Sequence, residues 1–264
     1  MKKALLISTF LLSTAFASNA LAGGSCGDNC TWDLEDGLLT ISGTGDMTNF
    51  SSQDDAPWYD LKDSINSIDI SNGITSIGNY SFKDLNAITS LNIPDSVTSI
   101  GQGAFLYMTV ENATLTIPNS VTSIGAGAFK GMGGVASLTI PNSVTSIRGG
   151  TFMNMNGIVD ITIPDTTELR MGTYSPFEGI DLSQVTFHCA GVLEQCKANM
   201  AAAGYEVGTY NMVQAPYSKK QANGSRAYYD ANGKLIGYQG KRIYTVDEAN
   251  EVAGKKNTLK IRYK

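Results

Sequence analysis

One unit of 23 or 24 residues recurs along the chain, and this repetition constrains the fold more than any other feature of the sequence. Three copies share the pattern L-x-I-P-x-S-V-T-S-I, with a phenylalanine five residues after its last isoleucine. A more divergent copy lies on each side. Equivalent isoleucines of the five copies are Ile70, Ile93, Ile117, Ile140 and Ile163. Repeats of this length predict a solenoid in which every copy forms one coil and stacks on the next.

Each position of the unit has a predictable place in the coil. The L-x-I segment puts two apolar side chains on one face of a short strand and the middle side chain on the other face, and the proline that follows ends the strand. V-T-S-I predicts a second short strand with its valine and isoleucine inward. The phenylalanine, with an apolar residue three positions later, fits one helical or 3₁₀ turn that buries both. Stacking then converts isoleucines and phenylalanines into two internal columns.

Two details of the repeat carry further expectations. Gly78, Gly101 and Gly125 directly follow the second strand, where we expect a tight turn with positive φ. The interval from Ile93 to Ile117 is one residue longer than the other isoleucine intervals, and the extra residue lies near Glu111 and Asn112, between the helical turn and the next strand. We expect this insertion to leave the core positions undisturbed.

The full pattern, L-x-I-P-x-S-V-T-S-I-G-x-x-A-F, resembles the BspA-like class of leucine-rich repeats of bacterial surface antigens, over residues 67–187. The segment before it, CGDNCTWDLEDGLLTISGTGDM, looks like the small module that often precedes such repeats. The resemblance implies a right-handed, mainly β solenoid with short helical turns. It also implies a cell-surface or secreted protein that binds host proteins, other cells or glycans.

Segments on both sides of the repeats are expected to close the solenoid, because an open end exposes a strand edge and the core. Residues 32–34 and 38–41 alternate around Glu35-Asp36-Gly37, which predicts a hairpin. After the last repeat, AGVLEQCKANMAAAG is rich in helix formers and ends at Gly204, which predicts a capping helix.

The chain therefore divides into five segments. They are a signal peptide (1–22), an N-terminal cap module (23–66), the repeats (67–188), a C-terminal cap (189–210) and a basic appendage (211–264). In the appendage, a hairpin about residues 230–233 and a capping box from Thr245 to Glu248 predict a small α+β unit, with a mobile tail as the alternative. Residues 258–263 alternate in hydrophobicity and predict a final strand.

The first 22 residues have the features of a secretory signal. Lys2 and Lys3 precede an apolar run over residues 4–16, and Ala20-Leu21-Ala22 forms a cleavage site. This run is shorter than the about 20 residues that a membrane-spanning helix needs. We therefore expect an exported protein without a transmembrane segment, which is secreted, bound at the cell surface or periplasmic.

Export favours disulfides for the four cysteines. Cys26 and Cys30 precede the repeats, and Cys189 and Cys196 follow them. Stacked coils would hold these two groups roughly 25 Å apart, too far for a disulfide, so we predict local pairs. A zinc site that adds His188 is the weaker alternative, because one histidine and no second close cysteine pair make a poor ligand set. No metal or other cofactor is expected.

Charge is unevenly divided between the body of the chain and its last fifty residues. Residues 23–213 contain 6 Lys/Arg and 20 Asp/Glu, whereas residues 214–264 contain 11 and 4. An acidic body lacks the broad basic face that nucleic acid requires, so no such partner is expected. The basic residues are either a tether to an anionic envelope component or a solvated tail. They include Lys219, Lys220, Lys241, Arg242, Lys255 and Lys256.

The middle residues of the L-x-I strands should form an exposed ladder of small polar side chains. We identify as its members Asp69, Asn92, Thr116, Thr139, Thr162 and Thr186. Thr-Ser pairs, from Thr75-Ser76 to Thr145-Ser146, should form a second ladder beside it. Regular arrays of this kind suit an extended protein or glycan contact, although small hydroxyl residues also simply keep an exposed sheet soluble.

No enzymatic activity is expected. His188 is the only histidine, so a catalytic triad would have to use it, yet it lies beside a predicted disulfide. Acidic pairs such as Asp54-Asp55 occur, but no motif fixes two carboxylates in a cleft as a glycosidase needs. The sequence favours an exported binding or adhesion protein. A periplasmic or envelope structural protein tethered by its basic tail, and more remotely a carbohydrate-active enzyme, are the alternatives.

Overall fold

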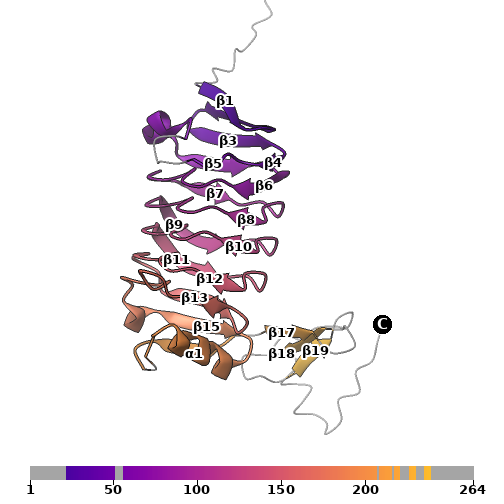
Figure 1. The fold of residues 1–264 in the computed structure, drawn as a ribbon, viewed down its shortest axis with the longest axis vertical. Coiled ribbons are helices and arrows are strands. Elements are labelled where there is room, and N and C mark those ends of the chain that lie inside the picture. Colours follow the sequence, from indigo (N-terminus) through magenta and orange to yellow (C-terminus); the bar gives the residue numbers. More distant parts are fainter. Residues whose placement is uncertain are drawn as a thin grey trace, which may run out of the picture.

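The chain winds into a mainly β solenoid whose coils stack along one long axis, from β1 at one end to β15 and α1 at the other (Figure 1). The computed structural model describes residues 22–50, 56–206, 208–215, 217–220, 226–229 and 235–238. The predicted signal peptide, apart from Ala22, and the predicted capping box and final strand of the appendage lie outside these residues. The repeat architecture expected from the sequence is confirmed.

One face of the solenoid, which we call the strand face, is built from the L-x-I segments. Its coil strands are β5 (Ser67–Ile70), β7 (Ser90–Asn92), β9 (Thr109–Thr116), β11 (Gly133–Thr139), β13 (Asp160–Pro164), β15 (Thr186–Ala190) and β16 (Asn211–Gln214). Pairing is parallel, so equivalent positions of successive coils stack, as Leu138 does on Ile161. The strands form two separate sheets, ordered β1-β2-β3-β5-β7 and β16-β15-β13-β11-β9.

A second face is built from the V-T-S-I segments, which form the short parallel strands predicted for them. These strands are β4 (Gly45–Asp46), β6 (Ile74–Ile77), β8 (Ser99–Ile100), β10 (Ser123–Ile124), β12 (Ser146–Ile147) and β14 (Glu168–Leu169). They are ordered β10-β8-β6-β4 and β12-β14. In the fifth copy, buried Thr167 replaces the inward valine, and its hydroxyl donates to the Val144 carbonyl at 2.9 Å.

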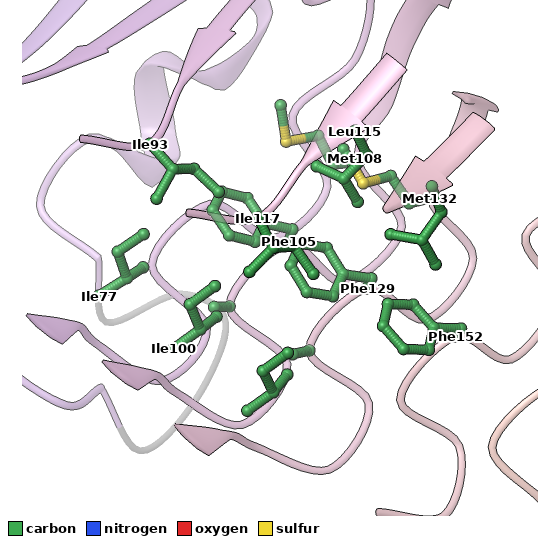
Figure 2. Close-up of a cluster of buried hydrophobic side chains, with 14 of the residues drawn as sticks. Ile77, Ile93, Ile100, Phe105, Met108, Leu115, Ile117, Phe129, Met132 and Phe152 are labelled. Atoms are coloured by element: carbon green, nitrogen blue, oxygen red, sulfur yellow. The ribbon is translucent and has the colours of Figure 1, made fainter. Parts of the chain in front are cut away.

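The predicted phenylalanine column runs through the core. Adjacent rings from Phe82 to Phe177 stack with centroids 5.3–5.8 Å apart and interplanar angles of 8–17°. Figure 2 shows Phe105, Phe129 and Phe152 in line, with Ile77 and Ile100 beside them. Trp58 extends the column by one ring and stacks on Phe82 at 5.7 Å. Every coil therefore buries one large ring, and no coil could bury it alone.

The glycine that recurs after the second strand of the repeat has a different role from the one expected. Gly78, Gly101 and Gly125 do not adopt positive φ, which falls two residues later, for example at Gly103 and Gly127. Gly78, Gly101 and Gly125 instead lie against the backbone of an earlier coil. A Cβ on Gly101, for example, would come within 2.6 Å of the Asn79 backbone nitrogen. Close approach between coils, and not the turn itself, excludes a side chain here.

Both predicted caps are present. At one end, β2 (Cys30–Glu35) and β3 (Leu38–Gly43) form the expected antiparallel hairpin, flanked by β1 (Ala22–Gly27). β3 pairs in parallel with β5, which joins this cap to the first coil. At the other end, α1 (Leu193–Ala202) follows β15 and ends before Gly204, at φ +78°. 3₁₀ helices η1 (Tyr59–Ser64) and η2 (Leu182–Gln184) complete the capped body.

Both local disulfides predicted from the sequence are formed. Cys26 and Cys30 have Cα atoms 5.0 Å apart and join β1 to β2. Cys189 and Cys196 have Cα atoms 6.0 Å apart and join β15 to α1. Each disulfide therefore fixes a cap and not a repeat.

The last four described strands belong to two different sheets. β16 pairs in parallel with β15, so the boundary drawn at residues 210 and 211 separates a strand from the solenoid sheet to which it belongs. Beyond it, β17 (Tyr217–Lys220), β18 (Arg226–Tyr229) and β19 (Leu235–Tyr238) form an antiparallel sheet. The β18–β19 pair is the hairpin expected about residues 230–233.

Candidate functional site

The strand face carries the polar ladder expected from the repeat. Parallel pairing aligns Asp69 with Asn92 and, farther along, Thr116 with Thr139 and Thr139 with Thr162. The first four side chains of the ladder are exposed and Thr162 is half-buried. Among the described residues, no hydrogen bond engages the hydroxyls of the three threonines. These groups stand about 4.8 Å apart from strand to strand and are open to a ligand.

Thr186 does not belong to this ladder, and its assignment there was wrong. It pairs with Asp160, whereas His188 pairs with Thr162 and Cys189 with Ile163. The sixth apolar pair is therefore Phe187 and Cys189, two residues later than the sequence pattern suggested. Because side chains alternate along a strand, a shift of two residues keeps Thr186 on the same face, in the neighbouring row.

The ladder of Thr-Ser pairs on the second face is engaged within the protein. The Thr98 hydroxyl donates to the Thr75 carbonyl at 3.1 Å, and the Thr122 hydroxyl donates to the Thr98 carbonyl at 3.3 Å. Thr75 itself donates to the Asp46 carboxylate at 2.6 Å. These threonines join successive coils, which favours a structural role for them.

The strand face opens between β7 and β9. Within the described residues, backbone pairing between the two segments is limited to a bridge between Ile88, just before β7, and Val110 of β9. The Ile88 N–H donates to the Thr109 carbonyl at 3.0 Å, and the Glu111 N–H donates to the Ile88 carbonyl at 3.1 Å. Beyond that point they lie in different sheets. A cavity of about 380 Å³ lies between them, lined by Asn92 on one side and Thr116 on the other. The polar ladder is therefore interrupted between its second and third members.

The inserted residue of the second copy accounts for this opening. β9 pairs with β11, but the register shifts twice between them. The five residues from Thr109 to Ala113 lie opposite the three from Gly133 to Val135, and Ala113 and Thr114 then lie opposite Val135 and Ser137. β9 is thereby displaced from β7. Leu91 is left half-buried, whereas the equivalent Leu138 is 1% exposed. The core positions that flank the insertion, such as Met108, Leu115 and Ile117, stay buried as expected, and the change falls on Leu91 across the opening. The 24-residue spacing from Ile93 to Ile117 was the only sequence signal of the cavity.

Chemically, the cavity has an apolar floor and a polar rim. Its floor includes Ile88, Val110, Leu115, Met132 and Val135. Ser90, Asn92, Asp95, Thr114 and Thr116 line its polar part. Its volume lies in the range of small ligand sites, and a concave apolar surface with a few polar groups is the common form of such sites. We refer to it as the β7–β9 cavity.

His188, which was weighed for catalysis and for metal binding, forms a surface pair with Asp160. His188 hydrogen-bonds through Nε2 to the Asp160 carboxylate at 2.8 Å, and both side chains are partly exposed. Cys189 lies in its disulfide and does not contribute a ligand. In the part of the chain that the structure describes, no three His, Cys, Asp or Glu side chains gather as a metal site would require. The pair joins adjacent strands of the strand face.

The basic residues singled out in the tail are only partly placed. Lys219 and Lys220 lie in β17. The other basic residues named from the sequence lie outside the described residues; they are Lys241, Arg242, Lys255 and Lys256. None of the described helices is long and apolar enough to cross a membrane.

The family of the chain follows from its repeats. The model of the BspA-type leucine-rich repeat region matches residues 57–188 in six copies. The chain belongs to this family. The BspA-type match has one more copy than the five we identified, and it begins beside Trp58, the ring that extends the phenylalanine column. No protein among curated sequences matches the chain.

Solved structures similar to this BspA-type chain include leucine-rich repeat proteins. One from Eubacterium ventriosum is 26% identical, with a TM-score of 0.53 over 66% of this chain and 45% of its own. The pneumococcal vaccine antigen PcpA is 17% identical, with a TM-score of 0.47 over 69% and 47%. A leucine-rich repeat protein from Bacteroides ovatus is 20% identical, with a TM-score of 0.41 over 62% and 49%. The chain thus spans about half the length of these relatives.

Proposed function

We propose that this protein is exported and binds host proteins, other cells or glycans through the strand face of its solenoid. The observation that carries the proposal is the row formed by Thr116, Thr139 and Thr162, whose hydroxyls have no partner among the described residues. The equivalent threonines of the second face are engaged in bonds between coils. A flat, regularly spaced and little-charged row can meet an extended partner along several coils at once.

Export is the part of the proposal that the cysteines support. Two disulfides fix the two caps, and such bonds persist in oxidising compartments outside the cytoplasm. The signal-like first 22 residues agree with export to the periplasm, the cell surface or the medium.

A triple substitution tests the strand face. Thr116, Thr139 and Thr162 changed together to Glu should abolish binding to any ligand found for the wild-type protein on a glycan array or a panel of immobilised extracellular-matrix proteins. Three carboxylates would cover the surface with charge that a neutral partner must desolvate. Asp69 already occupies this row, so the fold should tolerate the change.

A matched control places the same charge elsewhere. Ser99, Ser123 and Ser146 occupy equivalent positions of the repeat on the second face; Ser123 pairs with Ser99, and Ser146 pairs with Glu168. Changing the three serines to Glu should leave ligand binding intact. Equal affinity of both variants and wild type would contradict a strand-face site, whereas equal loss in both would indicate nonspecific repulsion.

A second candidate function rests on the charge of residues 214–264, with 11 Lys/Arg against 4 Asp/Glu. In this alternative the tail tethers the protein to an anionic envelope. Substitution of six basic residues by Gln should then release the full chain from vesicles that contain anionic lipid, as high salt should. The six residues are Lys219, Lys220, Lys241, Arg242, Lys255 and Lys256. Unchanged sedimentation with the vesicles would reject the tether.

A further inference from the structure

Two open strand edges flank the β7–β9 cavity in the middle of an otherwise continuous face. Residues 90–92 of β7 and 113–116 of β9 pair on their outer sides with β5 and β11. Toward each other, within the described residues, they make no backbone pairing. Backbone N–H and C=O groups beside a partly buried cavity are costly to leave without partners. Such edges are templates for an added strand.

The cavity also restricts the side chains that an added strand should carry. Because its floor is formed by Val110, Leu115 and Val135, one face of the strand should be aliphatic or aromatic. Because the other face of the strand would meet solvent, it should be polar. None of the residues that line the cavity is aromatic, so it offers no platform on which a sugar ring could stack.

Charge around the cavity favours a basic occupant. The sequence has no Lys or Arg between Lys83 and Lys130, but has Asp84, Asp95 and Glu111 there. Asp95 and Glu111 are exposed, and no ion pair among the described residues involves either of them. Lys83 lies 3.0 Å from the Asp84 carboxylate. Cationic side chains beside the cavity would supply the missing counter-charge.

One segment of this chain meets all three requirements. Residues 258–264, with the sequence TLKIRYK, alternate apolar Leu259, Ile261 and Tyr263 with basic Lys260, Arg262 and Lys264. This is the pattern of a half-buried strand. The segment lies outside the described residues, and its three basic residues also belong to the charge on which the tether candidate rests.

The segment can reach the cavity of its own molecule. Residues 239–257 separate it from β19, and such a linker spans up to about 60 Å when extended. From β16, the last strand of the strand face, to β9 there are four strand-to-strand steps, or about 20 Å along the axis at the usual strand spacing.

We propose that residues 258–264 occupy the β7–β9 opening of the same molecule and bond as a strand to the free edge of β9. Leu259 and Ile261 enter the cavity. Lys260 and Arg262 lie outward, near Asp95 and Glu111. The basic tail then completes the strand face, and it also covers the gap between Asn92 and Thr116 in the polar row.

Photo-crosslinking of the full chain tests the position of the segment. With p-benzoylphenylalanine in place of Ile261, irradiation should join that residue to peptides from 88–95 or 110–118 within a monomer. The same probe in place of Arg262, on the outward face, should give far less of this product. Cross-links to other regions, or products found only in dimers, would overturn the proposal, the latter in favour of a second copy.

Hydrogen exchange supplies an independent measurement. Leu259→Asp with Ile261→Asp in the full chain should speed amide exchange at residues 113–116 by about tenfold or more, because these amides lose their partner strand. Far-UV circular dichroism should show that the solenoid remains folded. The control, Thr258→Asp, adds charge on the outward face and should change exchange far less. Equal exchange in all three proteins would show that the cavity is not occupied by this segment. Neither test needs an outside ligand, so failure of the strand-face function leaves its outcome unaffected.

Discussion

The phenylalanine column predicts a specific cost for removing one of its interior rings. Phe129 is fully buried and stacks on Phe105 at 5.3 Å and on Phe152 at 5.5 Å. Phe129→Leu keeps most of the apolar volume but removes both ring pairs. Phe129→Ala removes the ring and leaves a cavity between two coils.

The magnitudes follow from the number of ring contacts. Each aromatic pair contributes about 0.5–1.5 kcal/mol beyond its buried area, so the two pairs of Phe129 predict a loss of about 1–3 kcal/mol for Phe129→Leu. Truncation of a buried phenylalanine to alanine costs about 3–5 kcal/mol. Phe50 offers a matched control, because it makes one ring pair, with Trp58 at 6.1 Å. The free energy of unfolding lost with the ring pairs should therefore be about half as large in Phe50→Leu as in Phe129→Leu.

Chemical denaturation followed by two probes measures both the size and the spread of the effect. The only two tryptophans, Trp32 and Trp58, lie on the N-terminal side of Phe129, whereas far-UV circular dichroism reports on all coils. In a solenoid, stability depends on contacts between neighbouring coils. Phe129→Ala should thus separate the fluorescence transition from the dichroism transition, which should coincide in the wild type.

Two results would refute this reasoning. One is a Phe129→Leu loss no larger than that of Phe50→Leu. The other is coincident transitions for Phe129→Ala together with a loss under about 1 kcal/mol, well below the usual cost of such a truncation. Either would mean that the rings stack without contributing to the coupling between coils.

Two further predictions concern the backbone beside the cavity and the C-terminal cap. Gly134→Ala should lower the melting temperature more than Gly157→Ala. Both glycines have positive φ, but a Cβ on Gly134 would collide with the Val110 carbonyl oxygen, whereas one on Gly157 would meet open space. Equal losses of melting temperature in the two variants would contradict this prediction. Burial raises the pKa of Tyr205 above its usual 10.0, so the neutral phenol is favoured in the folded state. Its stabilising contribution is complete below pH 10 and is lost as pH rises through the folded-state pKa. Tyr205→Phe should flatten this alkaline decline, and an unchanged slope would show that the residue does not cause it.

Much of the fold could be predicted because each of its features is either periodic or local. The ring column follows from phenylalanines at a fixed spacing, as between Phe105 and Phe129. Cys189 and Cys196 are near neighbours in sequence, so their pairing needed no knowledge of distant contacts. Alternation around Asp36-Gly37 was enough to predict the β2–β3 hairpin.

Register and pairing between coils were harder to predict. Thr186 and His188 project from the same face of one strand, and only pairing with β13 decides which of them continues the row of Thr162. Gly101 is required by the proximity of Asn79 in the preceding coil, which a single repeat does not reveal. In both cases the deciding contact lies one coil away.

The sequence by itself determined that this protein is a capped BspA-type solenoid, because apolar residues at a constant period can be buried only by stacking. It did not determine where the strand face is open. One inserted residue beside Glu111 shifts the register of β9 on β11, and the β7–β9 cavity lies beside this shift, where β7 pairs with β5 and β9 with β11. The tertiary structure decided this, since a gap between two strands depends on how both pair with their other neighbours.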